Sequence, residues 1–416
     1  MRKSLFTTLM STLLLSVLPV SAQIKPTMIS HIEGDPHCRQ WVDSIFQTLS
    51  MEEKVGQLLV VTIHPTTDPA SLAIMHESLE TYHVGGILFD AATLEAYALS
   101  TNYAQENSRV PLLMTFDGEW GLRMRIRSIP AYPRNGFLGH TNDNYLLYRY
   151  GKETARQLRE LGMHVNFAPV ADVNINPNNP VIGTRSFGID PHRVADQVIA
   201  YASGLENEGI LSVSKHFPGH GDTNVDSHKA LPVLPFTRER LDSIELYPFR
   251  EYVRAGLGGV MVGHLEVPAL DETPGLPSSL SHKMVTGLLK EEMGFDGLIF
   301  TDALAMKGVA KFEHPTLRAI MAGNDMVLIP RPLKPEVEAV YEAVRDGRIP
   351  MEYLDAECRK ILTFKYALGL SDLKPVRLEG LAERINTPEA QAMLHELQQV
   401  AQDVNVQPEK DPTANP

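Results

Sequence analysis

Residues 211–228 read LSVSKHFPGHGDTNVDSH, and this stretch decides how the rest of the chain is interpreted. Its first seven residues form a β-rich run, and residues 215–228 contain three histidines, two aspartates and a lysine among glycines and a proline. Turn formers at this density argue against a helix. The stretch therefore predicts a buried strand that ends in a loop of titratable side chains. A metal site, a catalytic acid/base pair and a structural turn all fit that loop.

Similar apolar runs recur along the chain and alternate with helical periodicity. The runs are LLVVTI 58–63, GGILF 85–89, PLLMTF 111–116, VNFAPV 165–170, LSVSKHF 211–217, GGVMVGH 258–264, GLIFTD 297–302 and DMVLIP 325–330, and helical patterns cover 144–161, 193–208, 238–255 and 283–293. Continuously apolar runs indicate strands buried on both faces, as in parallel sheets. Eight βα units predict an α/β fold, a (β/α)₈ barrel of the TIM type. A doubly wound open sheet is the rival, but no glycine-rich phosphate turn follows the first run.

Polar residues follow several of these runs where each strand should end. Asp117, His216, His264 and Asp302 stand at or just beyond the ends of four different runs. In a (β/α)₈ barrel the carboxyl ends of the strands form one rim, where active sites are built. These side chains are therefore expected to meet at one site.

The ends of the chain differ from the barrel pattern. Residues 1–22 begin with two basic residues, continue with an apolar run and end in Val-Ser-Ala, which predicts a secretory signal peptide cleaved after Ala22 and an exported protein, periplasmic or secreted. The apolar run is too short for a membrane span. Residues 23–370 are expected to form a single barrel domain. Residues 371–416 are expected to form a linker, a helix from Pro388 to about residue 400 and a disordered tail, like the truncated start of a second domain.

Bulk properties exclude some partners. The net charge of −13 argues against nucleic acid, whose phosphates require basic surface. Two cysteines, Cys38 and Cys358, lie near opposite ends of the sequence, and both a disulfide and two buried thiols are open. No cofactor is indicated.

Several long motifs, in order along residues 45–370, resemble glycoside hydrolase family 3, especially its bacterial β-N-acetylhexosaminidase branch. They are LSMEEKVGQLL 49–59, NPVIGTRSFGIDP 179–191, KHFPGHGDTNVDSH 215–228, GFDGLIFTDALAM 294–306 and AGNDMVLIP 322–330. The resemblance implies a retaining exo-glycosidase acting on terminal β-linked N-acetylglucosamine, including peptidoglycan fragments. It implies that Asp302 is the nucleophile and that His228, held by Asp226, is the acid/base. It also implies that the sugar is bound by Asp117, Arg125, Arg185, Lys215 and His216.

The residue types suit that chemistry. Retaining hydrolysis needs a carboxylate at the anomeric carbon and a proton donor at the leaving oxygen. A histidine can donate and then accept that proton near neutral pH. The two glycines of PGHG predict a mobile loop that brings the dyad to the substrate. Where the family pattern commonly reads Asp-Gln-Glu-Gly-Gly, this chain has DGEWG 117–121, and Trp120 in place of a glycine leaves the local pocket shape, and so the exact sugar, open.

Other interpretations of the same residues remain. Asp302 could cap the helix that follows it. Glu119, His220 and Asp222 are expected to be structural, and His264 to line the pocket. A metal-dependent hydrolase could use His216, His220, Asp222, Asp226 and His228, although Pro218 and Gly219 disrupt a helical HxxxH site. A β-glucosidase specificity and a non-catalytic sugar-binding protein are the further alternatives.

Overall fold

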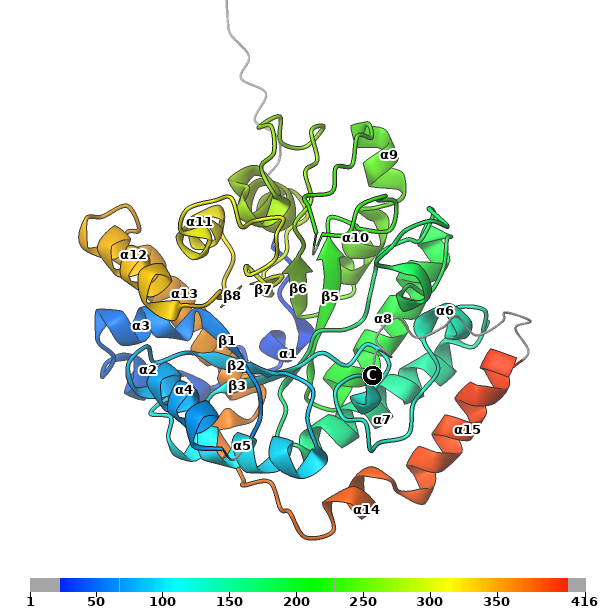
Figure 1. The fold of residues 1–416 in the computed structure, drawn as a ribbon, viewed down its shortest axis with the longest axis horizontal. Helices are drawn as coiled ribbons and strands as arrows, with labels where there is room; N and C mark the ends of the chain where they lie inside the picture. Colours follow the sequence, from blue (N-terminus) through cyan, green and yellow to red (C-terminus); the bar gives the residue numbers. More distant parts are fainter. Residues whose placement is uncertain (1–22, 67, 228, 403–416) are drawn as a thin grey trace, which may run out of the picture.

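The computed structural model describes residues 23–66, 68–227 and 229–402. Within these residues, eight parallel strands are ordered β7-β6-β5-β4-β3-β2-β1-β8, and an isolated bridge between Phe300 and Met326 joins the two edges. Helices surround the strands (Figure 1). The predicted (β/α)₈ barrel is therefore confirmed, nearly closed at the seam between β7 and β8.

The strands coincide with the apolar runs. They are β1 Leu59–Ile63, β2 Gly86–Phe89, β3 Leu113–Phe116, β4 Val165–Asn166, β5 Leu211–Phe217, β6 Gly259–Val262, β7 Leu298–Thr301 and β8 Val327–Leu328. Nearly every strand residue is buried, as expected for a parallel sheet covered on its outer face by helices. The fourth run was predicted to continue to residue 170, but β4 stops at Asn166. The proline at 169 has no N–H to donate to a neighbouring strand.

Helices follow the strands on the outside of the barrel. The first part of the chain holds α1 Thr27–Ser30, α2 Pro36–Phe46, α3 Met51–Gln57, α4 Pro69–Glu80, α5 Leu94–Glu106, η1 Leu122–Met124, α6 Asn135–Leu138, α7 Asn144–Glu160, η2 Gly183–Arg185 and α8 Pro191–Asn207. The second part holds α9 Arg238–Ser243, α10 Tyr247–Arg254, η3 Ser278–Leu280, η4 Lys283–Glu292, α11 Pro315–Ala322, α12 Leu333–Arg345, α13 Met351–Ala367, η5 Leu370–Asp372, α14 Leu381–Ile385 and α15 Pro388–Gln402.

One predicted helix is divided in two. The pattern over 238–255 predicts a continuous helix, whereas the structure has α9 and α10 with a break between Ser243 and Tyr247. Pro248 lies in the first turn of α10, where a missing N–H is tolerated. The same proline inside a continuous helix would remove an intrahelical hydrogen bond, so the helix restarts there.

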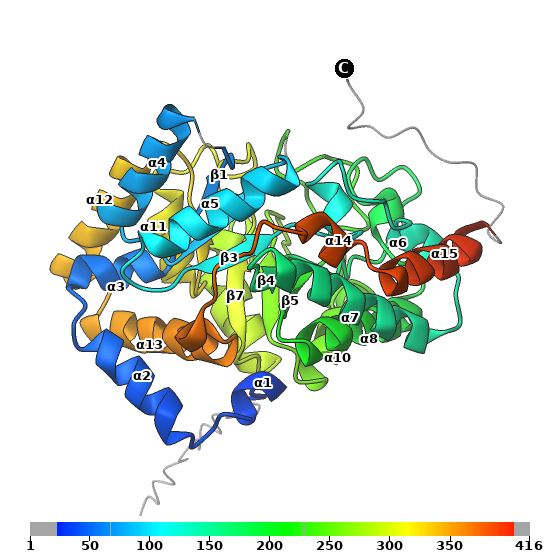
Figure 2. The ribbon, with the colours of Figure 1, turned by 90° about the horizontal axis from the view of Figure 1, so that it is seen from below.

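The segment after the barrel packs against it. Arg156 of α7 donates to the carbonyls of Arg384 and Ile385, at 2.6 and 2.9 Å, and Arg384 pairs with Glu160 at 2.6 Å. Helix α15 then runs along α6 and α7 at the side of the barrel (Figure 2). Residues 373–402 thus belong to the folded body, and the tail predicted to be disordered lies outside the described residues. Within the described residues, no helix is both long and apolar enough to cross a membrane.

The two cysteines lie close to each other in the fold. Cys38 of α2 and Cys358 of α13 are both buried in one small apolar cluster, and both are free thiols. Burial raises the pKa of Cys358 to about 12, so this thiol stays protonated at neutral pH. Of the two sequence alternatives, the structure has the buried thiols.

A buried lysine lies on α13. Lys365 has no exposed surface, and its Nζ donates to Oε1 of Gln57 at 2.6 Å. Burial lowers the pKa of Lys365 to about 7. Burial, with Lys365 as a second cause, lowers the pKa of His164 to about 3. Since His164 directly precedes β4, this cluster lies toward the amino ends of the strands.

Candidate active site

Five strands present polar side chains at their carboxyl ends. Asp117 follows β3, and Asp172 lies beyond β4. Lys215 and His216 are among the last three residues of β5. His264 follows β6, and Asp302 follows β7. All these ends share one rim of the barrel because the strands are parallel. The prediction that Asp117, His216, His264 and Asp302 lie on a common rim is confirmed.

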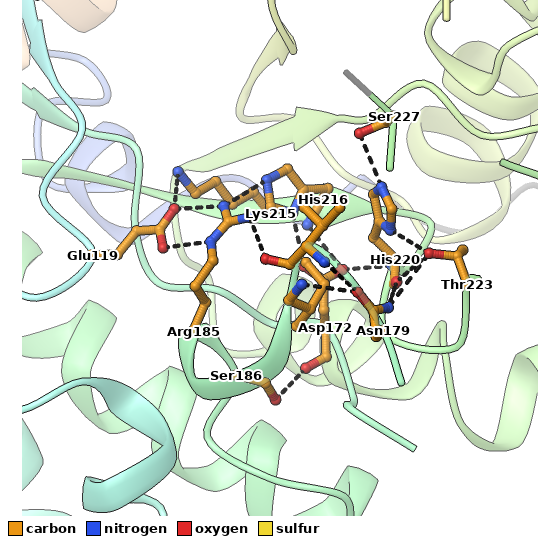
Figure 3. Close-up of polar contacts among 12 residues, drawn as sticks. Glu119, Asp172, Asn179, Arg185, Ser186, Lys215, His216, His220, Thr223 and Ser227 are labelled. Atoms are coloured by element: carbon orange, nitrogen blue, oxygen red, sulfur yellow. Dashed lines mark hydrogen bonds and ion pairs between the residues drawn. The ribbon is translucent and has the colours of Figure 1, made fainter. Parts of the chain in front are cut away.

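Two carboxylates and three cations form a partly buried ion cluster. Asp117 contacts Nζ of Lys215 at 2.6 Å and also pairs with Arg125. Glu119 accepts from Arg185 through both oxygens, at 2.7 and 2.8 Å, and contacts Lys215 at 2.7 Å. Figure 3 shows Glu119 between Arg185 and Lys215. Lys215 thereby connects the two carboxylates and fixes their spacing.

The cluster keeps its members charged. Burial alone would raise the pKa of Asp117, but Lys215 and Arg125 hold it below its ordinary value. Burial would likewise raise the pKa of Glu119, yet Arg185 and Lys215 hold it well below its usual range. Burial would lower the pKa of Lys215, and Asp117 and Glu119 raise it instead. The site therefore offers fixed, ionised groups at neutral pH.

Glu119 has a larger part in the site than the sequence indicated. Its side chain is fully buried and is the shared partner of Arg185 and Lys215, two residues predicted to bind the sugar. It lies in the DGEWG turn, where Gly121 adopts a φ of +78° that favours glycine. Nothing in the residue type alone reveals the partners of Glu119.

His216 lies between a carboxylate and a guanidinium. Its Nδ1 is 2.7 Å from Oδ2 of Asp172, and its Nε2 is 3.2 Å from Nη2 of Arg185. A guanidinium can only donate and a carboxylate can only accept, so these contacts place the imidazole proton on Nδ1. Asp172 was missed from the sequence, although it follows the fourth apolar run and the strand-end rule applies to it.

Asp302 accepts a main-chain hydrogen bond and lies in the electrostatic field of nearby basic side chains. The Ala303 N–H donates to its Oδ1 at 2.7 Å. Burial would raise the pKa of Asp302, but His216, His264, the Ala303 amide and Lys215 hold it below its ordinary value. His264 is itself fixed by Ser279, at 2.7 Å from its Nδ1, and its Nε2 donates to the Ala303 carbonyl at 3.1 Å. Asp302 is therefore an ionised carboxylate on the rim.

The loop after β5 is packed through its glycines. A Cβ on Gly221 would lie 1.9 Å from the Val173 carbonyl oxygen, and a Cβ on Gly219 would lie 2.9 Å from Cβ of Glu245. The sequence suggested that these glycines make the loop mobile. The structure gives them another role, since they allow the loop to approach two other segments closely.

His220 fastens the same loop internally. Its ring contacts Oγ1 of Thr223 at 2.8 Å and Oγ of Ser227 at 3.0 Å, and its carbonyl accepts from Asn179 at 2.8 Å. Burial lowers the pKa of His220 to about 4, so the ring is neutral at neutral pH. Its structural role agrees with the sequence expectation, as does that of Asp222, which pairs with Arg240 at 2.8 Å.

The proposed dyad is only partly within the described residues. Asp226 lies in this loop, half-buried, and its carbonyl accepts from the Lys229 and Ala230 N–H groups at 2.8 and 3.1 Å. His228, the predicted acid/base, lies outside the described residues. Its role stays a prediction.

The metal-dependent alternative finds no donor set in the described part of the chain. No three histidine, cysteine, aspartate or glutamate side chains there are arranged to hold one ion. Both ring nitrogens of His216 and of His220 already have protein partners, as described above.

A family model, two related proteins and a solved structure all point to the same family. Residues 50–364 match the model described as the glycosyl hydrolase family 3 N terminal domain. Beta-hexosaminidase A of Pseudoalteromonas piscicida is 32% identical over 342 residues, which are 74% of this chain and 56% of that protein. The beta-N-acetylglucosaminidase/beta-glucosidase of Cellulomonas fimi is 30% identical over 368 residues, which are 86% of this chain and 64% of that protein. The chain thus spans less than two thirds of the length of either relative.

A solved structure agrees with these relatives. The family 3 beta-N-acetylglucosaminidase from Paenibacillus sp. FPU-7 superposes with a TM-score of 0.78 at 34% identity, covering 85% of this chain and 69% of that one. The match to the family model extends over most of the barrel, from the helix before β1 to α13. The chain therefore belongs to glycosyl hydrolase family 3, of which it carries the N-terminal barrel domain.

Proposed function

We propose that this protein is a retaining exo-β-N-acetylhexosaminidase that releases terminal β-linked N-acetylglucosamine. The observation that carries the proposal is the ion cluster of Asp117, Glu119, Arg125, Arg185 and Lys215, together with an ionised Asp302 on the same barrel rim. The printed names of the relatives support the amino-sugar specificity. Residues 23–370 would form the catalytic domain.

The chemistry assigned to the site has two steps. In the first, an oxygen of Asp302 attacks the anomeric carbon while the bond to the leaving oxygen breaks, and His228 donates its proton to that oxygen. In the second, His228 takes a proton from water, and the water oxygen replaces Asp302 at the anomeric carbon. Asp226 orients the imidazole and stabilises its charged form. The lowered pKa of Asp302 supports its role, since only the carboxylate is a nucleophile.

Sugar recognition is assigned to the ion cluster. Asp117 is 17% exposed at its side chain and can accept hydroxyl protons, while Arg125 and Lys215 have donors beyond those that hold the carboxylates. Arg185 and His216 complete the pocket wall. A substrate would meet groups that are already fixed by one another, so little reorganisation accompanies binding.

The deciding experiment compares two aryl glycosides. We expect turnover of 4-nitrophenyl N-acetyl-β-glucosaminide to exceed turnover of 4-nitrophenyl β-glucoside, and Asp302→Asn to abolish both without changing the melting temperature. A clear preference for the plain glucoside would replace the amino-sugar assignment with a β-glucosidase. That second candidate is favoured by the C. fimi relative, whose printed name carries both activities.

Export is proposed on the sequence of residues 1–22. The protein would be periplasmic or secreted, with a carbohydrate as its partner. N-terminal sequencing of the protein recovered from the native host should begin at Gln23. A mature chain that begins at residue 1 or 2 would refute the proposed cleavage.

A further inference from the structure

Asp172 is a fully buried carboxylate that joins two functional segments. Its Oδ2 is 2.7 Å from Nδ1 of His216, and its Oδ1 accepts from the N–H groups of His216 and His220 at 3.2 and 2.6 Å. Its side chain has no exposed surface. Figure 3 shows it below His216 and His220. One carboxylate therefore holds both histidines of KHFPGH.

On one side, Asp172 and Arg185 together determine which nitrogen of His216 carries the proton. Nε2 of His216 faces Nη2 of Arg185 at 3.2 Å and must accept, because a guanidinium has no lone pair to offer. Nδ1 must then donate, and the acceptor it meets is Asp172. Arg185 is in turn held by Glu119, so the imidazole connects Asp172 to the ion cluster.

On the other side, Asp172 fixes the start of the loop that carries Asp226. The His220 N–H donates to Asp172, and the His220 ring contacts Oγ of Ser227 at 3.0 Å. Ser227 directly follows Asp226 in the chain. The sugar-binding end and the acid/base end of this segment thus share one anchor.

We infer that Asp172 is a positioning residue that, opposite Arg185, holds His216 in one tautomer and anchors the β5 loop. This inference rests on the proposed function, because His216 matters there as part of the sugar pocket. Asp172 does not touch the substrate and acts through the two histidines.

The isosteric change Asp172→Asn isolates the tautomer. The asparagine oxygen can still accept from both main-chain N–H groups, but its NH₂ group replaces the acceptor opposite Nδ1 of His216. If Nδ1 keeps its proton, two donors face each other. If the proton moves to Nε2, that nitrogen faces the Arg185 donor instead. His216 can no longer satisfy both neighbours, whereas the loop keeps its anchor.

A double-mutant cycle tests this through activity. Asp172→Asn should lower kcat/KM for the aryl N-acetyl-glucosaminide by about ten- to a hundredfold, as expected for loss of one buried charge-assisted hydrogen bond. In the His216→Ala background the same change should cost less than about threefold, because the group through which it acts is gone. Asp222→Asn, which alters a carboxylate of the same loop paired with Arg240, serves as the control and should leave kcat/KM unchanged. Independent, multiplying effects of Asp172→Asn and His216→Ala would overturn the inference.

A second measurement does not depend on turnover. Imidazole ¹⁵N NMR of histidine-labelled protein, assigned with His216→Ala, should show His216 protonated at Nδ1 in the wild type. In Asp172→Asn it should show either the other tautomer or an Nδ1 resonance shifted by loss of its acceptor. Unchanged ¹⁵N resonances of His216 would overturn the inference even if activity fell. If the wild type turns over none of the aryl glycosides, the proposed function fails, and the NMR comparison still decides the role of Asp172.

Discussion

Replacing Lys365 by methionine should stabilise the protein at low pH and destabilise it at high pH. The side chain is fully buried, its one described partner is Oε1 of Gln57, and burial lowers its pKa from 10.5 to about 7. That lowering corresponds to about 5 kcal/mol. The folded-state pKa lies below the unfolded value, so between pH 7 and 10.5 the unfolded chain binds more protons and the free energy of unfolding rises with pH. Below pH 7 Lys365 is protonated in both states, and the full free-energy cost of burying its charge lowers the stability of the folded protein.

Methionine removes the ammonium but leaves the Gln57 oxygen without its donor. An unsatisfied buried acceptor costs about 1–3 kcal/mol at every pH. The variant should therefore be more stable than the wild type by about 2–4 kcal/mol at pH 6 and less stable by about 1–3 kcal/mol above pH 10.5. The two stability curves should cross near pH 9, where the remaining cost of protonating Lys365 is about 2 kcal/mol.

Urea unfolding of both proteins, followed by circular dichroism from pH 6 to 10.5, measures the difference. Burial also raises the pKa of Glu206 to about 7, and burial followed by Asp325 raises that of Glu357 to about 8, so each protein alone has a complex pH profile. Both glutamates are present in wild type and variant, and their titration cancels in the difference. A difference that stays constant with pH, or a variant less stable at pH 6, would refute the assigned burial cost.

Further predictions concern the site and its loop. His228→Ala should lose far more first-step rate on a natural disaccharide than on a dinitrophenyl glycoside, because an activated phenol leaves without being protonated. Asp302→Ala should be inactive on both substrates. Equal losses for His228→Ala on the two substrates would make His228 a binding residue. Glu119→Gln should lower stability by about 3–5 kcal/mol and kcat/KM at least about tenfold, since Arg185 and Lys215 lose the buried carboxylate that they share, and wild-type melting and kinetics would contradict this. Gly221→Ala should lower the melting temperature and kcat, because the added Cβ would lie 1.9 Å from a main-chain oxygen. The control Gly287→Ala should change neither quantity, because no neighbour is closer than 3.9 Å to the added Cβ. Matching behaviour of the two variants would count against close packing of the loop.

Much of the architecture could be predicted because it depends on local pattern. Continuous apolar runs mark strands that are buried on both faces, and the parallel arrangement brings their carboxyl ends together whatever the loops do. Asp117, His216 and Asp302 were located by this rule. Asp172 obeys it too, but the fourth run extends past the end of β4, which obscured where the strand finishes.

Other features depend on contacts between distant segments. The glycines of PGHG have the composition of a flexible loop, and their close approach to Val173 and Glu245 cannot be inferred from the loop itself. Likewise, the partners of Glu119 lie 66 and 96 positions along the chain, so its place in the ion cluster emerges only when β3 and β5 are folded together. Helix α15 was predicted, whereas its packing along α6 and α7 was not.

The ion cluster affects how differently the site can interact with the bound sugar and with the transition state of its cleavage. Its three basic side chains are committed to Asp117 and Glu119, and within the described residues Asp302 has no basic side chain at ion-pair distance. A neutral sugar entering the pocket gives that carboxylate no full charge to neutralise. In the proposed mechanism the sugar becomes cationic as the glycosidic bond breaks, and the carboxylate of Asp302 would then face a full positive charge. On that proposal, the negative charge of Asp302 would stabilise the transition state more than the bound, neutral sugar.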